Sequence, residues 1–292
     1  MPRISVIIPC YNHGQYIDEA INSVLAQTFQ DFEIIVVNDG STDEFTINIL
    51  SNSIWPKTKV LHTENFGLSA ARNNGIKASS GEIIVTLDSD DVFLPTFFEK
   101  GISILEENEN IGVVSCFVEA FGHKPEFINY YKSGGLEHYI IENNSAASSM
   151  FRKKCWVDVG GYDESMKNGY EDWEFWISIT SLGWKVHIIP EFLFKYRKHA
   201  SSMLTKSNTM RPELVKYIFE KHQDALKEYF VDIVYTREQQ MLKYICKSAW
   251  EKEYNISLSK AFKTSKSYKL GNFLITPFAL LKKFFIKSIK GH

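Results

Sequence analysis

The stretch Ile83-Ile84-Val85-Thr86-Leu87-Asp88-Ser89-Asp90-Asp91 decides how the rest of the sequence is interpreted. Its apolar start is short and rich in β-branched residues, which is typical of a buried strand in a parallel sheet. Where the apolar residues stop, three carboxylates follow within four positions. Because side chains alternate along a strand, a strand that continued here would place Asp88 and Asp90 on the same face.

This acidic stretch has two interpretations. Two neighbouring carboxylates repel each other, and a divalent cation would remove that conflict. Oxygen ligands suit Mg²⁺ or Mn²⁺, and open α/β sheets bind ligands beyond the carboxyl ends of their strands. The same residues also fit a polar turn that caps a helix beginning near Pro95. Taken alone, the stretch favours neither the metal site nor the turn.

Strands and helices alternate around this stretch through residues 1–110. Apolar runs predict strands near residues 4–8, 32–37, 59–62 and 83–87. Helical spacing of apolar residues predicts helices at 16–25, around 49–50, at 67–77 and from 94 to 105. The alternation indicates βαβ units and a largely parallel sheet. The polar residues Tyr11, Asn12, Asp39, Asp88 and Asp90 follow strand ends, so we expect them at one edge of that sheet.

The pattern beyond Gly112 is more mixed. A strand is predicted at 113–118, a less regular stretch at 123–142, and a short helix between Arg152 and Gly160-Gly161. A helix is predicted to open at 169–176 and to run to about Leu182. Two short strands are predicted at 184–189 and 192–197, and helices from Pro212 onward.

Composition excludes several classes of protein. The formal net charge of -2 gives no reason to expect nucleic acid as a partner. The four cysteines lie far apart, which predicts neither zinc nor a disulfide framework and fits a reducing compartment. No apolar run is long enough for a membrane span. The first strand-helix turn lacks the glycine pattern of dinucleotide enzymes, and no P-loop lysine motif occurs.

Five short motifs occur in one order along the chain. They are Pro9-Cys10-Tyr11-Asn12, 37–43 (VNDGSTD), 67–73 (GLSAARN), Leu87-Asp88-Ser89-Asp90-Asp91 and Glu171-Asp172-Trp173. Together they resemble the family 2 glycosyltransferases, inverting GT-A enzymes that use nucleotide-sugar donors. The resemblance covers roughly residues 3–200 and departs from the family at none of these positions.

The resemblance implies a fold and a division of the chain. The fold class is α/β: a GT-A, Rossmann-like, mostly parallel mixed sheet flanked by helices, with a C-terminal helical extension. Residues 1–205 form the glycosyltransferase domain, with a nucleotide-sugar-binding half at 1–110 and an acceptor and catalytic half at 111–205. Residues 206–292 form the helical extension with a basic amphipathic tail.

The resemblance assigns residues of the first half to the donor. Tyr11 stacks on uracil, because an aromatic face suits a flat base, and Asp39 accepts the imide N–H of that base. Arg72 either reaches the donor diphosphate or holds Asp88, since a guanidinium suits both oxyanions. The remaining residues assigned to the donor pocket are Pro9, Asp88 and Ser89.

The metal ligands implied by the resemblance are Asp90, Asp88 and His199. Asp90 binds Mn²⁺ or Mg²⁺ directly, and Asp88 faces both the ribose and the metal. The cation stabilises the charge that grows on the leaving nucleoside diphosphate. His199 lies in the segment Tyr196-Arg197-Lys198-His199, and a neutral imidazole can complete the shell of manganese; a surface or core histidine remains the alternative.

The resemblance places the catalytic base at Asp172. Inversion requires a base on the side of the sugar opposite the leaving group, where it deprotonates the attacking hydroxyl. Glu171 beside it orients the acceptor or the loop, and Trp173 stacks on the acceptor. The alternative is purely structural, because acids at a helix start are favoured by the free N–H groups and the macrodipole.

These residues together imply an inverting, metal-dependent transfer from a nucleotide sugar. The expected donor is a UDP-sugar that carries a hexosyl or N-acetylhexosaminyl group. The expected acceptor is a glycan or a lipid-linked glycan in the biosynthesis of bacterial surface polysaccharide or glycoconjugate. Two other hypotheses are a sugar-nucleotide or glycan-binding module without turnover and a nucleotidyltransferase. The turn after Pro9 lacks the basic, glycine-rich loop of the latter.

The C-terminal tail is basic. From Tyr254 to His292 there is no Asp or Glu, whereas eight lysines occur. Thr276-Pro277 predicts a helix start, after which Phe278, Leu281, Phe285 and Ile289 form an apolar face opposite lysines. This pattern predicts a helix on an anionic membrane surface and a cytoplasmic protein attached to the inner face of the membrane. Packing of that helix on the domain is the alternative.

Overall fold

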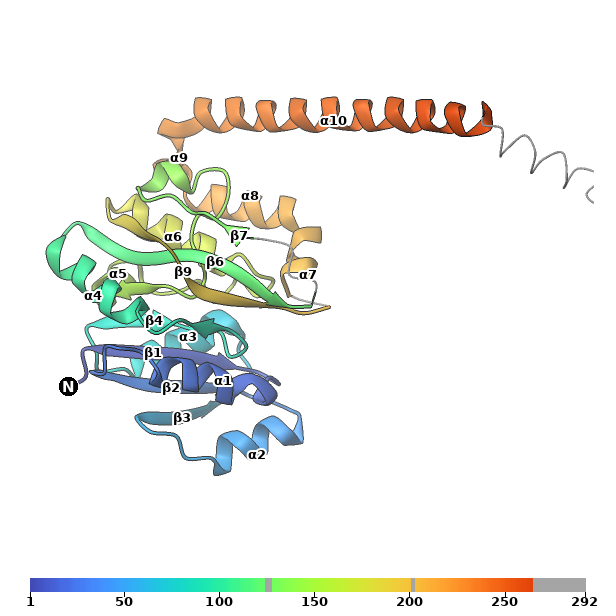
Figure 1. Ribbon diagram of the computed structural model, residues 1–292. Helices are drawn as coiled ribbons and strands as arrows, with labels where there is room; N and C mark the ends of the chain where they lie inside the picture. Colours follow the sequence, from blue (N-terminus) through green and yellow to red (C-terminus); the bar gives the residue numbers. More distant parts are fainter. Residues whose placement is uncertain (124–127, 201–202, 265–292) are drawn as a thin grey trace, which may run out of the picture. The chain divides into compact units, whose positions relative to one another are not determined.

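The computed structural model describes residues 1–123, 128–200 and 203–264. Within them, the strands form one mixed sheet in the order β3-β2-β1-β4-β8-β6-β9-β5, and β7 pairs with β6 (Figure 1). The strands are β1 (Ile4–Cys10), β2 (Phe32–Asp39), β3 (Thr58–Thr63), β4 (Ile83–Thr86), β5 (Val92–Phe93), β6 (Ile111–Gly122), β7 (Ile128–Asn129), β8 (Met150–Arg152) and β9 (Lys185–Lys198).

Helices flank this sheet and continue beyond it. They are α1 (Gly14–Leu25), α2 (Glu44–Asn52), α3 (Leu68–Lys77), α4 (Phe97–Glu107), α5 (Lys153–Val159), α6 (Glu171–Ser181), α7 (Met203–Thr209), α8 (Arg211–Lys221), α9 (Gln223–Leu226) and α10 (Phe230–Thr264). Short 3-10 turns occur at Leu136–His138 and Lys227–Tyr229. The α/β class with a mixed, partly parallel sheet flanked by helices is therefore confirmed.

The first half of the sheet is parallel. β3, β2, β1 and β4 run in the same direction, and Ile4 pairs with Phe32 on one side and Ile83 on the other. The carboxyl ends of β1, β2 and β4 therefore lie at one edge. This confirms the expected convergence of the polar residues that follow these strands.

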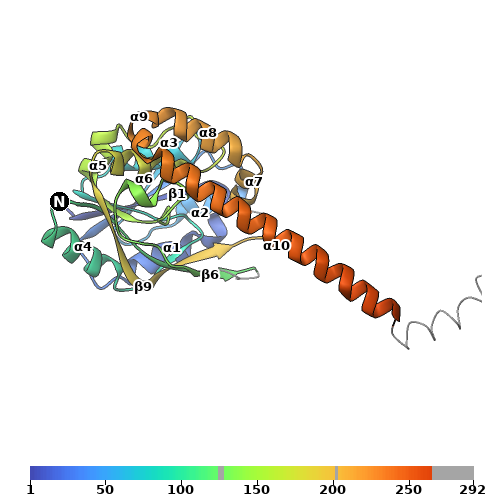
Figure 2. The same ribbon diagram turned by 90° about the horizontal axis from the view of Figure 1, so that it is seen from above.

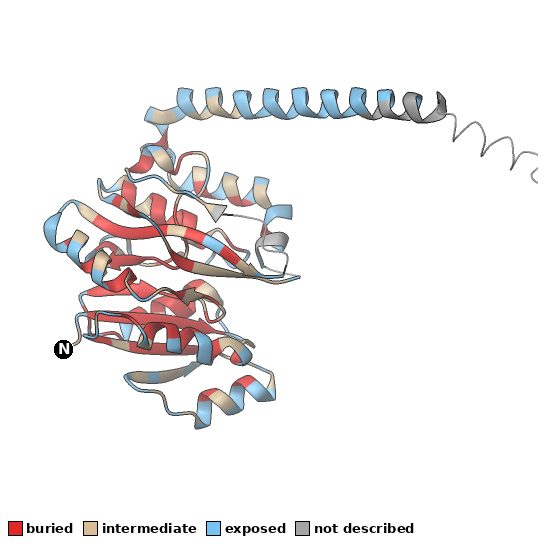
Figure 3. Ribbon diagram, viewed as in Figure 1, coloured by how far each residue is buried: buried red, intermediate tan, exposed pale blue. Residues whose placement is uncertain are grey.

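Period-two alternation in β1 builds both faces of this half. Ile4, Val6 and Ile8 belong to a core that includes residues of α1 and α4. Ile7 points to the opposite face, where α3 packs so closely that a Cβ on Gly75 would collide with Ile7 Cγ2. The two views agree, with α1 and α4 on one side of the sheet and α3 and α6 on the other (Figure 2). The central strands are buried between them (Figure 3).

The second half of the sheet differs from the sequence prediction in two places. Two strands were expected at 184–189 and 192–197, but β9 is one strand parallel to β6. Its register jumps so that Cys116 pairs with Ile189 and Phe117 with Phe192. The irregularity accommodates Pro190, which has no N–H for a ladder. The short strands β5 and β8 were not predicted, because two or three residues carry no periodicity.

Contact density divides the chain into two compact units, Met1–Phe230 and Val231–His292. The sequence placed the end of the catalytic domain at residue 205. The first unit extends to Phe230 because α8 buries Leu214 and Ile218 and α9 buries Leu226. In the second unit the described residues are helical to Thr264 and mostly exposed.

The two expectations about membranes concern different parts of the chain. The amphipathic tail predicted at 276–290 lies outside the described residues. Within the described residues, none of the helices combines the length and apolarity that crossing a bilayer requires.

Candidate active site

The acidic stretch after β4 is a turn rather than a continued strand. The N–H of Asp91 donates to the carbonyl of Asp88 at 3.0 Å. The expectation that Asp88 and Asp90 share a strand face is therefore wrong, because the turn sends them to different partners. The turn does not cap the next helix either, since the N-cap of α4 is Thr96 and makes no side-chain cap.

Arg72 joins this turn to a second acidic element far along the chain. Its Nη2 donates to Asp88 Oδ1 at 2.8 Å, and its Nη1 donates to Glu171 Oε1 at 2.7 Å. Burial alone would lower the pKa of Arg72, but the carboxylates of Asp88 and Glu171 outweigh burial and raise it. The side chain is 0% exposed, so of the two roles expected for Arg72 the structure fits the holding of Asp88, and reaching the donor diphosphate does not fit.

Glu171 consequently has a different partner from the one expected. It was predicted to orient the acceptor or its loop, whereas its side chain is 7% exposed and its carboxylate accepts a hydrogen bond from the Arg72 guanidinium. Arg72 comes from α3 and Glu171 from the start of α6. The pair therefore ties the first half of the domain to the helix start that carries Asp172.

Asp90 meets His199, as the sequence proposed for a shared metal shell. Asp90 Oδ2 lies 2.7 Å from His199 Nε2, and the ring of His199 packs against that of Tyr16 at 5.3 Å. Two carboxylates and an imidazole are ligand types that suit Mn²⁺ or Mg²⁺, and Asp88 keeps 28% of its side chain exposed. In the described stretches, no three His, Cys, Asp or Glu side chains are arranged as a complete cation site. Asp90 and His199 are suitable ligand types, and a cation bound by them would need further ligands.

His13 was not predicted at this position. Its Nδ1 lies 3.9 Å from Asp90 Oδ2, and its ring is 5.8 Å from that of His199. It stands in the turn after β1, directly behind the motif Pro9-Cys10-Tyr11-Asn12. In the sequence, the one signal for His13 was its position directly after a motif that was expected at the same sheet edge.

Asp91 attaches the acidic turn to β9. It accepts a hydrogen bond from the backbone N–H of Arg197 at 2.7 Å, and Arg197 Nε donates to the carbonyl of Asp90 at 2.8 Å. Burial, with the charges of Asp90 and Asp88 added, raises the pKa of Asp91 well above its usual range. Arg197 thereby sets the distance between the turn and His199.

Tyr11 and Asp39 occupy neighbouring strand ends, as predicted for the donor base. Tyr11 is 45% exposed. The buried Asp39 carboxylate accepts backbone hydrogen bonds from Phe66 and Gly67, at 3.0 Å each. These bonds fix its orientation, while each carboxylate oxygen retains a second lone pair.

Pro9 and Ser89, the other residues assigned to the donor, are buried. Pro9 pairs with Val37 inside the sheet, and Ser89 is 4% exposed. Burial raises the pKa of Cys10 to about 11, although interactions with His13 and Ser89 lower it, so the thiol is protonated at neutral pH. Pro9 and Ser89 therefore lie beneath the surface of this sheet edge.

Asp172 stands at the start of α6, where the backbone is strained. Gly169 and Tyr170 have φ of 96° and 65°, and the left-handed region is unusual for a tyrosine. Asn143 Nδ2 donates to Asp172 Oδ2 at 2.7 Å. Burial, assisted by the charge of Glu171, raises the pKa of Asp172 to about 7, although Arg72 opposes the shift. A carboxyl tuned in this way suits proton abstraction at neutral pH.

Trp173 does not fit its expected role in stacking on the acceptor. It is 1% exposed, and its Nε1 donates to the carbonyl of Tyr139 at 2.7 Å. A ring with almost no accessible face cannot stack on a sugar, so Trp173 is part of the core beneath the site. Trp176, one turn further along α6, is fully buried.

A cavity of about 510 Å³ connects the acidic turn to Asp172. It is lined from the first half by Asp88 and Asp91, and from α6 by Glu171 and Asp172. Its far wall comes from α7 and α8, through Met203, Ser207, Asn208 and Arg211. The sequence assigned residues after 205 to an extension, whereas this segment completes the cavity.

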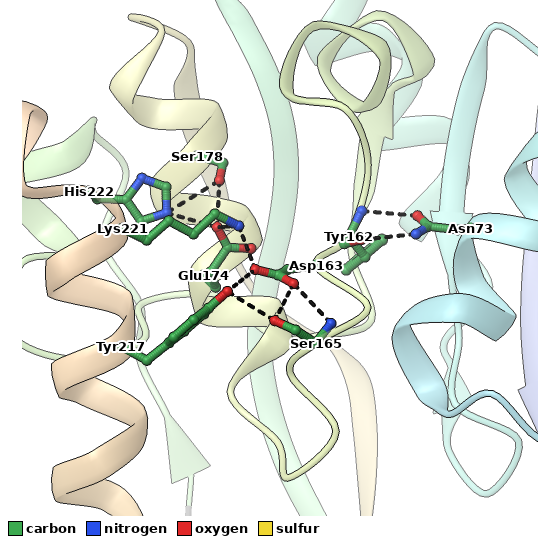
Figure 4. A network of polar contacts seen from close by, with 9 residues as sticks. All are labelled: Asn73, Tyr162, Asp163, Ser165, Glu174, Ser178, Tyr217, Lys221 and His222. Atoms are coloured by element: carbon green, nitrogen blue, oxygen red, sulfur yellow. Dashed lines mark hydrogen bonds and ion pairs between the residues drawn. The ribbon is translucent and has the colours of Figure 1, made fainter.

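A polar network behind the cavity holds α8 against α6 (Figure 4). Glu174 of α6 receives Lys221 Nζ at 2.8 Å and lies 2.7 Å from His222 Nε2. Lys221 Nζ also reaches Asp163 at 2.6 Å, and Tyr217 donates to the same carboxylate at 2.8 Å. Burial would raise the pKa of Glu174, but His222 and Lys221 outweigh burial and lower it. The network fixes the helix that forms the far wall.

Comparison with known proteins gives a consistent result. The family model described as glycosyl transferase family 2 matches residues 5–162, which is more than half of the chain. An uncharacterized glycosyltransferase of Haemophilus influenzae is 31% identical over 234 residues, covering 74% of this chain and 72% of that protein. One of Methanocaldococcus jannaschii is 29% identical over 248 residues, covering 80% and 83%.

Solved structures show the same fold at lower identity. The S. aureus TarS fragment 1–349 in complex with UDP-GlcNAc has a TM-score of 0.57 and 22% identity, covering 70% of this chain and 60% of that chain. Its complex with UDP has a TM-score of 0.54 and 23% identity. The chain thus spans about three-fifths of the length of these structures, and the likeness establishes the GT-A architecture.

Proposed function

Because the chain belongs to glycosyl transferase family 2 and is a glycosyltransferase, we propose that it inverts the sugar that it transfers from a UDP-sugar to a hydroxyl of a glycan or lipid-linked acceptor. The observation that carries this proposal is the buried link from Asp88 through Arg72 to Glu171. This link fixes the position of the acidic turn, where the leaving group is proposed to lie, relative to the start of α6, which carries Asp172.

Asp172 is the proposed base. With a pKa near 7, a substantial fraction is ionised at neutral pH and can accept the proton of the acceptor hydroxyl. As that oxygen bonds to the anomeric carbon, the bond from this carbon to the diphosphate oxygen breaks, and the nucleoside diphosphate leaves from the opposite face. Asn143, which donates to Asp172, orients the carboxylate toward the cavity.

The leaving group is proposed to lie at the acidic turn. Asp90, Asp88 and His199 would hold Mn²⁺ or Mg²⁺ there. When bound, such a cation neutralises negative charge that develops on the departing diphosphate. Arg72 holds Asp88 in place through their ion pair.

The donor nucleotide is proposed to be UDP, bound by Tyr11 and Asp39. The exposed Tyr11 ring offers a stacking face, and the fixed Asp39 carboxylate offers an acceptor for the imide N–H of uracil. The TarS complexes contain UDP and UDP-GlcNAc on the same architecture. We propose a hexosyl or N-acetylhexosaminyl group as the transferred sugar and bacterial surface polysaccharide or glycoconjugate as the product.

Replacing Asp90 tests the metal. Asp90→Ala is expected to lower manganese-dependent release of UDP from a panel of UDP-sugars by roughly 100-fold or more, because a direct ligand is lost. The assay measures UDP in the presence of Mn²⁺, Mg²⁺ or EDTA. The exposed Glu220→Ala on α8 is the matched control. Release at the wild-type rate by Asp90→Ala would show that the metal assignment is wrong.

We propose peripheral attachment to the cytoplasmic face of the membrane through the basic tail. Truncation after Lys269 removes the amphipathic segment and four of its lysines, and is expected to release the protein from anionic vesicles in flotation assays. Neutral phosphatidylcholine vesicles are the control, since they lack the charge that attracts lysine. Unchanged binding of the truncated protein to anionic vesicles would contradict the proposal.

A further inference from the structure

Arg211 has a distinctive place in the cavity. Among the described residues that line it, five are carboxylates, and Arg211 at the start of α8 is the single Lys or Arg. The carboxylates are Asp88, Asp91, Glu142, Glu171 and Asp172. Four of these already have partners, because Arg72 binds Asp88 and Glu171, the backbone of Arg197 donates to Asp91, and Asn143 donates to Asp172. The charge of Arg211 therefore needs its own explanation.

The partners of Arg211 are neutral. Its Nη1 donates to the Tyr170 hydroxyl at 3.1 Å and its Nη2 to the carbonyl of Ile141 at 3.5 Å. The guanidinium also lies over the rings of Tyr170 and Trp173, at 5.5 and 5.4 Å. In the part of the chain that the structure describes, no carboxylate lies within ion-pair distance of it. Two of its five N–H groups are used, and the others remain for a ligand.

The position of Arg211 is fixed in advance. The α8 helix buries Leu214 and Ile218, and Lys221 at its other end is held by Asp163 and Glu174 (Figure 4). The aromatic rings beneath the guanidinium restrict its plane. A guanidinium that is held in place without an ion-pair partner among the described residues can bind an oxyanion with little further ordering.

The site lies close to the proposed base. The two residues that Arg211 covers, Tyr170 and Trp173, flank Asp172 within one helical turn, about 5 Å along the axis. Tyr170 also donates to Asn208 of α7 at 2.7 Å, so the same wall holds the strained start of α6. Asp88 is the one residue assigned to the donor that also lines this cavity, whereas Tyr11, Asp39 and Asp90 do not line it. An anion at Arg211 therefore belongs to the acceptor.

We infer that the acceptor carries an oxyanion, a phosphate or a carboxylate, on the unit that presents the attacking hydroxyl or on its direct neighbour, and that Arg211 binds it. This inference rests on the proposed function, whose acceptor side it specifies. A guanidinium binds both oxyanions through paired N–H groups. A neutral glycan acceptor would leave the charge of Arg211 without a partner during catalysis.

The test uses three probes that differ in charge at one position: glucose, glucose 6-phosphate and glucuronate. Ligand-observed NMR titrations measure their binding to the full chain in the presence of UDP. In the wild-type protein the charged probes are expected to bind about 10- to 100-fold more tightly than glucose. Arg211→Gln is expected to remove that preference. Arg211→Lys is expected to keep part of it, since lysine retains the positive charge but cannot form paired, parallel N–H hydrogen bonds.

The matched control is Lys216→Gln, which removes one positive charge from the exposed face of the same helix and is expected to change nothing. A preference for glucose 6-phosphate alone assigns the oxyanion to phosphate, and one for glucuronate alone to carboxylate. The inference is overturned if the wild-type protein does not distinguish charged from neutral probes, or if Arg211→Gln keeps the preference. It is also overturned if Arg211→Gln weakens UDP binding equally.

Failure of this inference is separable from failure of the proposed function. Release of UDP from UDP-sugars by the wild-type protein, measured without any acceptor, reports on the proposed donor site alone. If the wild-type protein releases UDP but shows no preference for oxyanions, the proposed glycosyl transfer is retained and the assignment of an anionic acceptor is rejected.

Discussion

Asp172→Asn is expected to lower sugar transfer by roughly 10²- to 10⁴-fold while leaving UDP affinity unchanged. Asn has nearly the same shape as Asp and its carbonyl can still accept the hydrogen bond from Asn143. What is lost is the ability to take a proton from the acceptor hydroxyl. The measurement is kcat/KM for transfer with the acceptor identified by screening, together with a titration of UDP.

The same change is expected to stabilise the fold at high pH. The pKa of Asp172 is raised in the folded protein from 3.8 to about 7. A raised carboxyl pKa contributes stability that is fully present below the unfolded pKa and is lost as pH rises through the folded one. The wild-type protein therefore loses stability from this group between about pH 4 and pH 7, of the order of 2–4 kcal/mol. Asn carries no charge at either pH and avoids this loss.

Urea denaturation at pH 5 and pH 8 measures the effect on stability. The difference between Asp172→Asn and wild type is expected to grow toward pH 8, and kcat/KM of the wild type is expected to rise through about pH 7. Asp158→Asn, at a carboxylate that pairs with Lys154 on α5, is the control and should show neither effect. Transfer at the wild-type rate by Asp172→Asn would remove Asp172 from the role of base.

The convergence of donor residues was predictable, whereas their contacts were not. Alternating strands and helices imply parallel strands, and parallel strands bring their ends to one edge, so Tyr11, Asp39 and Asp88 could be grouped from sequence. The turn at Asp88–Asp91 could not be distinguished from a continued strand, because short polar stretches carry no period. Strand alternation therefore gave the wrong orientation for Asp88 and Asp90.

Contacts between distant segments account for most of what the sequence left open. Arg72 and Glu171 are 99 positions apart, and nothing in the spacing of either motif says that they form a pair. Arg211 lies beyond the motifs, on a helix whose periodicity shows that one face is buried but not which cavity it reaches. Trp173 was misassigned for a related reason, since the sequence shows an aromatic residue beside a base without showing its depth.

Arg72→Met is expected to destabilise the protein by about 3–5 kcal/mol. The guanidinium is 0% exposed and holds two carboxylates at 2.7–2.8 Å, so its removal leaves Glu171 buried without a charge partner. Asp88 is affected less, because part of its side chain remains in contact with solvent. Met is chosen because it fills a similar volume, which limits the contribution of a cavity. Urea denaturation measures the change.

A double-mutant cycle separates the cost of the unpaired charge from the value of the link. Arg72→Met leaves the carboxylate of Glu171 buried without a partner, and Glu171→Gln removes that charge. The double variant is therefore expected to recover roughly half of the stability that Arg72→Met loses. Lys154→Met, which breaks an exposed pair with Asp158, is the control and is expected to cost about 1 kcal/mol or less. A loss below about 1 kcal/mol for Arg72→Met would contradict the idea that this pair joins the two halves. If the double variant is stable yet still transfers sugar poorly, the link acts on catalysis by fixing the acidic turn relative to Asp172, because stability alone would then no longer explain the defect.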